Sequence, residues 1–256
     1  MSGVDVSVER ARRIAVQRLE SLSRAGVTQL RRGHPAIDSP ATAKPQEVAA
    51  VAGAQHETPT PMTKTPSNKQ SALSIIQQEV AACIRCQELA DSRTQTVFGV
   101  GNPDARLCFF GEAPGADEDR QGEPFVGRAG KLLTDIIKKG MGLERSDIYI
   151  LNVLKCRPPG NRNPSPDEAG NCREYFERQI ETIDPEFICC LGSIAAHTLL
   201  ETNIAVGKLR GKIHDYRGRK VVVTYHPAYL LRNPSAKKHT WDDIQILMRE
   251  MGLPVP

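Results

Sequence analysis

Long hydrophobic runs are missing from this sequence. No stretch approaches the roughly 18 consecutive apolar residues of a membrane-spanning helix, and no charged start followed by an apolar segment marks a secretory signal. The seven cysteines are an odd number, which a complete set of disulfides would not leave. We therefore expect a cytoplasmic protein in a reducing compartment, without a membrane partner.

Residues 1–70 lack the pattern of a folded core. Residues 6–30 combine helix-compatible apolar spacing with many arginines, whereas residues 34–69 are rich in Pro, Thr, Ala and Ser and have no aromatic side chain. We predict a basic arm at residues 1–33, partly helical, and a disordered linker at residues 34–70. Asp5, Glu9 and Glu20 interrupt the arginines of the arm, which disfavours a transit peptide.

The net charge lies entirely in this N-terminal part. Residues 1–70 contain 10 Lys and Arg against 6 Asp and Glu, which equals the +4 of the whole chain, and residues 71–256 balance at 24 against 24. A basic arm of this kind either contacts DNA or RNA or is a solvated amphipathic helix on a tether. The sequence leaves both interpretations open.

From residue 71 onward, strand-like and helix-like segments alternate in one domain, residues 71–256, without an internal repeat. The predicted strands are residues 106–112, 147–155, 186–191 and 220–225, and the predicted helices are residues 127–139, 166–183, 193–201 and 240–251. The clearest helix start has Ser165 as N-cap, Pro166 at the first helical position and Glu168 as capping-box partner. Because strands that alternate with helices form a parallel sheet covered on both faces, we expect an α/β fold.

Four cysteines have a spacing that suits a metal centre. Cys83 and Cys86 form a C-x-x-C pair, Cys156 directly follows an apolar strand-like segment, and Cys172 lies on a predicted helix. Four thiolates with one tight pair suit a tetrahedral zinc ion or a 4Fe-4S cluster, which would connect three separate segments. Buried, chemically inert thiols are the alternative.

Unusual segments follow the predicted strands. The turn GEAPG at residues 111–115 and the acidic run at residues 117–119 follow the first strand, Asn152 lies near the end of the second, and His226 follows the last. Because ligands of parallel α/β sheets bind beyond the carboxyl ends of the strands, we expect these segments to converge on one site. Taken singly, each has a plain structural explanation, namely a tight turn, a satisfied buried amide or a structural histidine before proline.

These segments also resemble the motifs of a known family. The stretches GEAPGADEDRQGEPFVG, NVLKCRPPGNRNPSPDE and TYHPAYLLR, together with the order and spacing of the four cysteines, are similar to the iron-sulfur uracil-DNA glycosylases of family 4. The resemblance covers about residues 73–252 and leaves out the N-terminal arm. It implies a three-layer α/β/α sandwich around a four-stranded parallel sheet, plus a flexible N-terminal extension. It also implies excision of uracil from DNA for base excision repair, and a 4Fe-4S cluster on Cys83, Cys86, Cys156 and Cys172.

The resemblance further implies how the base is bound. Uracil must be flipped out of the duplex, at a cost of a few kcal/mol. Phe125 would stack on the flipped base, and Gly111, Glu112 and Ala113 would line its pocket. Asn152 would accept a hydrogen bond from uracil N3–H and donate one to O4, and cytosine presents the opposite pattern at both atoms. A buried amide left unpaired costs about 1 to 3 kcal/mol per group, so this side chain would discriminate strongly.

Two catalytic roles follow from the same resemblance. His226 resembles the family's donor to uracil O2, where negative charge develops, and one such donor is worth roughly 2.7 to 4 kcal/mol. Water must then attack the sugar. The best-known uracil-DNA glycosylases have an Asp where this chain has Ala113, so Glu118 and Glu112 are the candidates that orient the water. Glu118 is favoured because it resembles the family's acidic position.

Contacts to DNA should come from short polar and backbone groups, since residues 71–256 carry no net charge. Ser165 at a helix N-terminus suits a phosphate. Tyr229, Leu230, Leu231 and Arg232 resemble the wedge loop that fills the space left by the flipped base, and a plain hydrophobic anchor is the alternative.

The implied partner is uracil-containing DNA, single- or double-stranded, bound by a monomer whose N-terminal arm contacts another repair protein. One rival interpretation is a non-catalytic or damage-trapping relative. Covalent trapping is disfavoured, because CRPPGNRNP contains no histidine at the place where the trapping relatives have one. The other rival is a zinc-bearing nucleic-acid-binding module or a redox protein that shares only the cysteine spacing.

Overall fold

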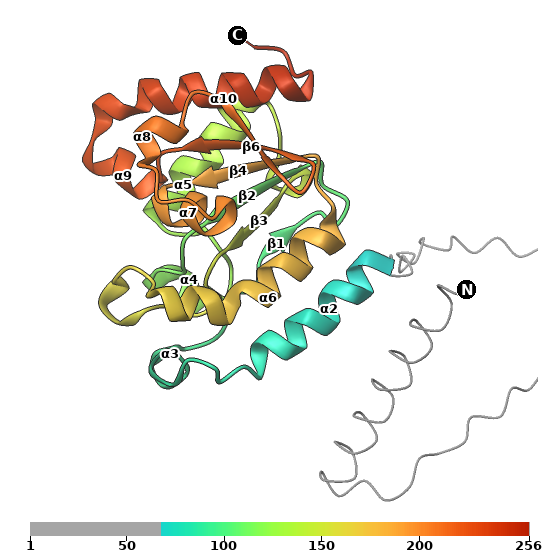
Figure 1. Cartoon of the computed structure of the whole chain (residues 1–256), viewed down its shortest axis with the longest axis vertical. Helices are drawn as coiled ribbons and strands as arrows, with labels where there is room; N and C mark the ends of the chain where they lie inside the picture. Colours follow the sequence, from blue (N-terminus) through green and yellow to red (C-terminus); the bar gives the residue numbers. More distant parts are fainter. Residues whose placement is uncertain (1–67, 256) are drawn as a thin grey trace, which may run out of the picture. The chain divides into compact units, whose positions relative to one another are not determined.

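The computed structural model describes residues 68–255, which form an α/β domain (Figure 1). The predicted basic arm lies outside the described residues, as does the predicted linker up to residue 67. Helix α2 (Asn68–Ala81) begins within the last three residues of that linker, so the folded part starts slightly earlier than predicted. Among the described helices, none is long and apolar enough to cross a lipid bilayer.

A mixed six-stranded sheet forms the centre of this domain, with the strand order β1-β3-β2-β4-β6-β5. Its four central strands are parallel, as predicted: β3 (Tyr149–Asn152), β2 (Leu107–Gly111), β4 (Phe187–Leu191) and β6 (Arg219–Thr224). The predicted number of four strands is wrong, because β1 (Val100–Gly101) and β5 (Ile213–Tyr216) add antiparallel edges. β1 has only 2 residues, and β5 is mostly exposed, so neither has the buried apolar run that marks a central strand.

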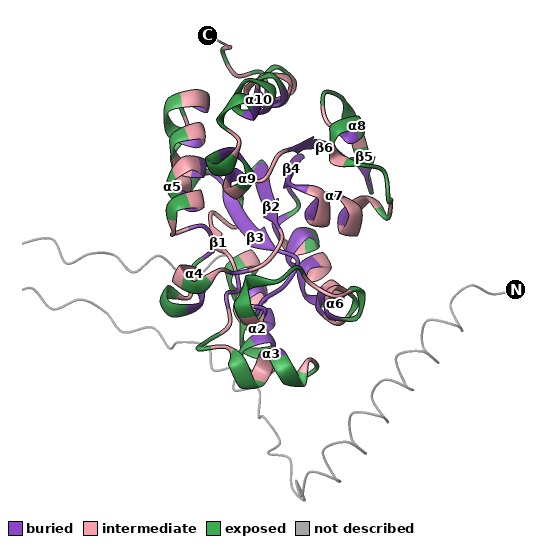
Figure 2. Cartoon of the chain, turned by 90° about the vertical axis from the view of Figure 1, so that its left-hand side faces the viewer, coloured by how far each residue is buried: buried purple, intermediate pink, exposed green. Residues whose placement is uncertain are grey.

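Helices cover both faces of the sheet and confirm the predicted three-layer sandwich (Figure 2). Helices α6 (Pro166–Ile183) and α7 (Ser193–Leu200) lie on one face with α2 packed against α6, and α5 (Arg128–Asp135) and α10 (Lys237–Met251) lie on the other. Alternate residues of one strand serve the two cores, since Phe110 faces the α6 side and Phe109 the α10 side. Every residue of β2, β3 and β4 is buried, as parallel strands covered on both faces require.

Helix α6 begins as the sequence predicts. The Ser165 hydroxyl accepts a hydrogen bond from the Glu168 backbone N–H at 3.2 Å, and the Glu168 carboxylate accepts one from the Ser165 N–H at 2.8 Å. Pro166 occupies the first helical position, and the helix ends before Asp184, whose φ of 49° is left-handed. The reciprocal cap fixes the start of the helix that carries Cys172.

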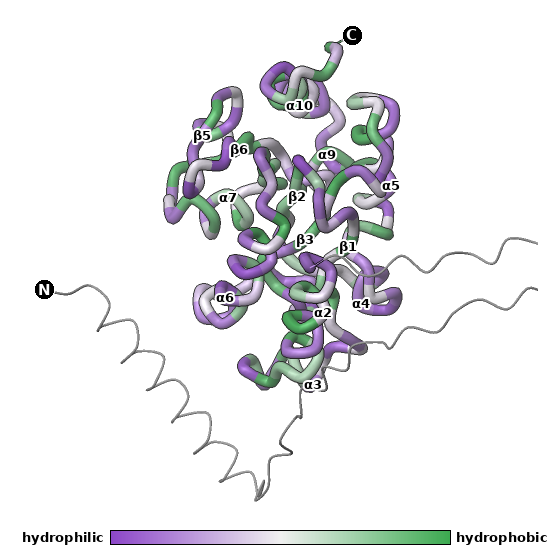
Figure 3. Tube along the Cα trace, turned by 90° about the vertical axis from the view of Figure 1, so that its right-hand side faces the viewer, coloured by the Kyte–Doolittle hydropathy of each residue, from purple (hydrophilic) through white to green (hydrophobic). Residues whose placement is uncertain are grey.

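Short helices fill the connections between these elements. They are α3 (Gln87–Ser92), α4 (Ala116–Gln121), α8 (Val206–Leu209), α9 (Pro227–Arg232), the π-helical continuation η1 (Ile136–Gly140) of α5, and the 3-10 turns η2 (Arg145–Asp147), η3 (Pro159–Asn161) and η4 (Pro234–Ala236). Figure 3 shows hydrophilic and hydrophobic residues on different sides of α10, as an amphipathic helix that covers a sheet requires. The connections that follow the carboxyl ends of β2, β3, β4 and β6 form the candidate site.

Candidate active site

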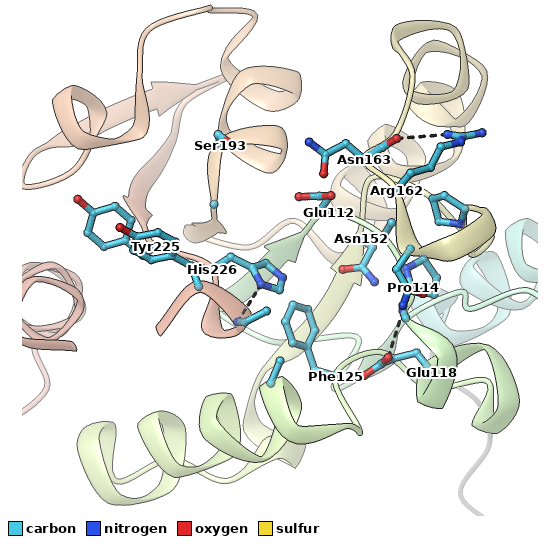
Figure 4. A pocket seen from close by; sticks show the side chains of 18 of the residues that line it. Glu112, Pro114, Glu118, Phe125, Asn152, Arg162, Asn163, Ser193, Tyr225 and His226 are labelled. Carbon is cyan, nitrogen blue, oxygen red and sulfur yellow. Dashed lines mark hydrogen bonds between the residues drawn. The ribbon is translucent and has the colours of Figure 1, made fainter. Parts of the chain in front are cut away.

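A cavity of about 670 Å³ lies beyond the carboxyl ends of the four parallel strands (Figure 4). Each strand contributes to its lining, with Glu112 after β2, Asn152 at the end of β3, Ser193 after β4 and His226 after β6. The predicted residues that line it are Glu112, Ala113, Glu118, Phe125, Asn152, His226, Tyr229 and Arg232. The predicted convergence of the strand-end segments is therefore confirmed.

Asn152 presents an unpaired acceptor beside this cavity. Its side chain is 2% exposed, and Oδ1 is buried without a hydrogen-bond partner among residues 68–255. Gly111 makes this placement possible, because a Cβ at that position would lie 2.2 Å from Asn152 Oδ1 and 2.7 Å from the Phe125 ring. Gly111 thus contributes by lacking a side chain. An orphaned buried acceptor costs free energy unless a ligand supplies the donor, so Oδ1 is poised to accept an N–H.

His226 is held as a neutral ring with a defined tautomer. It caps α9, and its Nδ1 accepts a hydrogen bond from the Ala228 backbone N–H at 3.1 Å. The pKa of His226 is lowered to about 4, mainly by burial and in part by nearby Arg232, although Glu118 acts in the opposite direction. At neutral pH the ring proton therefore lies on Nε2, which is the donor left for a ligand.

Phe125 completes this part of the cavity. Its ring is 6% exposed, and its centroid lies 5.5 Å from that of the His226 ring, with 33° between the two planes. Figure 4 shows the His226 ring and the Asn152 side chain pointing toward one another, with the Phe125 ring beside both. A planar heteroaromatic ligand would thus meet an aromatic face, a donor and an acceptor at once.

The two candidate carboxylates differ in their environment. Glu118 is fully engaged, since Oε1 accepts hydrogen bonds from the N–H groups of Val126 (3.0 Å) and Gly127 (3.1 Å), and Oε2 accepts one from Gly115 (3.1 Å). This carboxylate braces the turn after β2 against the start of α5. It has few lone pairs left for a water molecule.

Glu112 has the opposite character. Its carboxylate makes no hydrogen bond or ion pair within the described part of the chain, and burial raises the pKa of Glu112. A half-buried carboxylate that lines the cavity and has free lone pairs can accept a hydrogen bond from water. The geometry therefore favours Glu112 over Glu118, the reverse of the order that the sequence suggested.

The structure places the predicted DNA contacts at different depths. Leu230 is 1% exposed and packs inward from α9, so the prediction that it contacts DNA is wrong for this conformation, whereas Tyr229 and Leu231 are 39% and 41% exposed. The Tyr229 ring stacks on that of Tyr225, with centroids 5.1 Å apart. Ser165 lies outside the main cavity and lines a second hollow of about 300 Å³ between α6 and α7.

The four predicted ligand cysteines belong to one region. Cys83 and Cys86 pack against the core cluster that contains Cys156 and Cys172. Burial raises the pKa of Cys156 and is the main reason that the pKa of Cys172 is raised to about 11; Cys86 contributes to both increases because the thiols lie near one another. Thiols with such pKa values stay protonated unless a bound cation stabilises the thiolates.

The donor chemistry of these thiols fits a cluster. Arg93 donates a hydrogen bond to Cys156 Sγ at 3.0 Å, and Asn171 donates one to Cys86 Sγ at 3.4 Å. N–H donors of this kind stabilise sulfur ligands of an iron-sulfur centre. Within residues 68–255, no three His, Cys, Asp or Glu side chains lie close enough together to bind a single metal ion. The other three cysteines, Cys108, Cys189 and Cys190, are buried in the sheet.

Lys155 connects the thiol region with the cavity. Its side chain is 1% exposed, and Nζ donates hydrogen bonds to the backbone carbonyls of Asn152 (2.9 Å) and Phe98 (3.3 Å). Burial lowers the pKa of Lys155 to about 7, and nearby Cys172 raises it. Anionic sulfurs at the four cysteines would therefore favour the charged ammonium that holds the end of β3.

Several lining residues escaped the sequence analysis. Ser193 follows β4 and could have been found by the same strand-end argument that found Asn152 and His226. Tyr225 directly follows β6 and had the same signal, whereas Arg162 had none. Arg162 lines the cavity but makes a bidentate ion pair with Glu168 (2.7 and 2.9 Å), so its charge is largely spent within the protein.

Comparisons with known proteins agree with this geometry. Residues 98–245 match the family model described as the uracil DNA glycosylase superfamily. The chain is 44% identical over 169 residues to a type-4 uracil-DNA glycosylase of Thermotoga maritima, which covers 65% of this chain and 87% of the relative. It is 43% identical over 182 residues to a type-4 uracil-DNA glycosylase of Archaeoglobus fulgidus (68% and 90%). A type-5 uracil-DNA glycosylase of Thermus thermophilus is 30% identical over 188 residues (58% and 84%).

Proposed function

The chain belongs to the uracil DNA glycosylase superfamily, and we infer that it is a uracil-DNA glycosylase. Such an enzyme flips uracil out of DNA, hydrolyses its N-glycosidic bond and leaves an abasic site for base excision repair. The single observation that best supports this conclusion is the orphaned Oδ1 of Asn152, which faces the donor-bearing His226 across a cavity with an aromatic wall.

Asn152 is assigned the recognition of the base. Oδ1 accepts the hydrogen bond from uracil N3–H, and the amide NH₂ group donates to O4. Cytosine has an acceptor at N3 and a donor at N4, so both contacts would become repulsive. Because the side chain is 2% exposed, water cannot replace the lost partners, and each unpaired group costs about 1 to 3 kcal/mol. Recognition by one buried amide therefore suffices to reject cytosine.

His226 is assigned the stabilisation of the leaving uracil. Cleavage of the glycosidic bond places negative charge on the base, in part at O2, and leaves positive charge on the sugar. The neutral Nε2–H donates a hydrogen bond to O2 as this charge develops, and the Ala228 N–H keeps the ring in the required tautomer. One preorganised donor of this kind lowers the activation free energy by roughly 2.7 to 4 kcal/mol.

Glu112 is assigned the role of activating the attacking water. Its carboxylate lines the cavity, has no other hydrogen-bond partner among the described residues and has a raised pKa, so it can accept a proton from water that attacks the sugar. Glu118 serves the same reaction indirectly, because its three hydrogen bonds join the Phe125 loop to the turn after β2. Phe125 supplies the face on which the flipped base stacks.

Cys83, Cys86, Cys156 and Cys172 are the residues that would hold a 4Fe-4S cluster. When bound, it would supply a cross-link between the α2–α3 connection, the segment after β3 and α6, with no electron transfer in base excision. The raised thiol pKa values and the donors to sulfur support this assignment. The enzyme works as a monomer in a reducing cytoplasm, where all seven thiols remain reduced and the four ligand cysteines are free to bind the cluster.

The test uses oligonucleotides that differ only in one base, namely uracil, thymine or cytosine, offered as single and double strands. After incubation with purified protein, alkali cleaves the DNA at abasic sites. Cleavage only at uracil is the expected result. No cleavage by iron-replete protein would overturn the proposed activity, and a DNA adduct that survives a denaturing gel would identify a trapping protein instead.

A further inference from the structure

The loop that carries Phe125 is held in a strained conformation. It runs from Gly122 to Gly127 between α4 and α5, and Phe125 has a φ of 56°. An L-residue in the left-handed region costs about 1 to 2 kcal/mol and persists only where the surroundings fix it. The contacts around the loop therefore decide where the Phe125 ring lies.

Arg145 holds this loop from the side away from His226. Its guanidinium donates one hydrogen bond to the Pro124 carbonyl (3.0 Å), one to the Phe125 carbonyl (3.2 Å) and one to the Thr134 hydroxyl (3.2 Å). Arg145 is half-buried and has no carboxylate ion-pair partner within residues 68–255. A planar guanidinium that donates hydrogen bonds to two consecutive carbonyls fixes the path of the backbone between them.

Glu118 fixes two further backbone groups of the loop. The Glu118 carboxylate accepts hydrogen bonds from the next two backbone N–H groups, those of Val126 and Gly127. Gly130 of α5 lets the loop approach closely, since a Cβ there would lie 1.9 Å from the Phe125 carbonyl oxygen. Two carbonyls and two amides around Phe125 are thus each tied to a named partner.

The Phe125 loop separates the base cavity from another hollow. Phe125 lines both the base cavity and a hollow of about 570 Å³ on the other side, which Arg145 and Lys131 also line. Phe125 packs into the core cluster on the α10 side, but the hollow leaves one side of its loop without packed neighbours. The hydrogen bonds of Arg145 to the two carbonyls, together with those of Glu118 with the two following amides, oppose movement of the loop into this hollow.

Resting on the proposed function, we propose that Arg145 is a positioning residue for uracil excision. Its guanidinium fixes the left-handed backbone at Phe125, so that the ring forms the stacking face for the flipped base beside His226. Arg145 itself does not touch the substrate. Its effect must therefore act through the Phe125 side chain, and this distinguishes a positioning role from a purely structural one.

A double-mutant cycle tests this dependence. Single-turnover excision is measured for the wild type, Arg145→Ala, Phe125→Ala and the double variant. Base–aromatic stacking is worth about 1 to 3 kcal/mol, so each single variant should lose about 5-fold to 150-fold in rate. In the double variant the two losses should not multiply, and its rate should equal that of Phe125→Ala. Losses that multiply fully would overturn the proposal.

Two further variants protect the test. Arg145→Lys keeps a positive charge but cannot bind both carbonyls as a planar fork. It should therefore lower the excision rate when Phe125 is present and leave the rate unchanged in the Phe125→Ala background. It replaces Arg145→Ala in the cycle if that variant does not fold. Arg249→Ala removes an exposed arginine of α10 that lines neither the base cavity nor the hollow beside Arg145, and it should keep the wild-type rate. A wild type without excision activity would refute the proposed function, whereas an active wild type with multiplying losses would refute only the role of Arg145.

Discussion

Replacing each candidate carboxylate by its isosteric amide separates the two glutamates. Glu118→Gln keeps one oxygen for the Val126 and Gly127 N–H groups but turns an NH₂ group toward the Gly115 N–H. One hydrogen bond is replaced by two facing donors, and two charge-assisted bonds become neutral. With about 1 to 3 kcal/mol for the unsatisfied donor and about 1 kcal/mol for each of the two weakened bonds, the free energy of unfolding should fall by roughly 3 to 5 kcal/mol.

Glu112→Gln should have the opposite profile. The carboxylate has no hydrogen bond to lose among the described residues, and the substitution removes a charge whose burial is unfavourable, so stability should stay the same or rise. The excision rate should fall by about 10² to 10⁴, because the amide cannot accept a proton from water. The two variants thus place the loss of stability on one residue and the loss of chemistry on the other.

The pH dependence of stability gives an independent reading of Glu112. Burial raises its pKa in the folded state above the unfolded value. Between the two pKa values the folded protein binds more protons than the unfolded one, so this group's contribution to stability falls as pH rises through that window. Glu112→Gln should lack this component, whereas Glu118→Gln should retain it.

The assays are denaturant unfolding over a range of acidic to neutral pH and single-turnover excision on a uracil oligonucleotide. For a domain of this size, a loss of about 3 to 5 kcal/mol corresponds to a Tm decrease of roughly 6 to 20 °C. A Glu118→Gln variant of wild-type stability without activity, together with an active Glu112→Gln variant, would refute the assignment and make Glu118 the residue that orients the water.

Other substitutions have equally defined outcomes. Asn152→Ala should reduce uracil excision about 10²-fold or more by loss of both base contacts, and a normal rate would remove Asn152 from the site. His226→Ala should reduce it about 10² to 10³-fold; since the pKa of His226 is about 4, the wild-type rate should show no loss near the ordinary histidine pKa as pH falls, and a loss there would mean that the ring is protonated in the usual range. Cys156→Ala should lose iron and thermal stability together, measured by metal analysis and unfolding, and a full complement of iron would exclude this ligand. Leu230→Ala should cost about 2 to 5 kcal/mol of stability through a core cavity, whereas Leu231→Ala should spare stability and weaken excision from duplex more than from single-stranded DNA; equal behaviour of the two would contradict their placement on α9.

The sequence predicted the central layer well because parallel strands leave a strong signal. β2, β3, β4 and β6 appear as apolar runs, since helices bury them from both sides, and the start of α6 is written in its capping residues. The edge strands β1 and β5 were not predicted, because a pair of residues and an exposed hairpin strand carry no periodic pattern. A strand can thus be predicted from the sequence where both of its faces are buried.

The site divides in a similar way. Asn152, His226 and the turn that contains Glu112 could be assigned to one edge of the sheet, because all parallel strands end on the same side. The order of the two glutamates could not be predicted, since it depends on which backbone N–H groups reach each carboxylate. The inward direction of Leu230 depends on how the short helix α9 is rotated against the core, which six residues of sequence do not specify.

The sequence by itself determined the layered α/β fold, the group of four cysteines, and the residue types that gather at the ends of the strands. Periodicity, capping and motif spacing are local properties, and the chain order states them directly. Only the tertiary structure decided that Asn152 Oδ1 is left without a partner, that His226 is neutral, and that Arg145 and Glu118 hold the Phe125 loop. These features arise from burial and from contacts between segments distant in sequence, and such contacts exist only once the chain has folded.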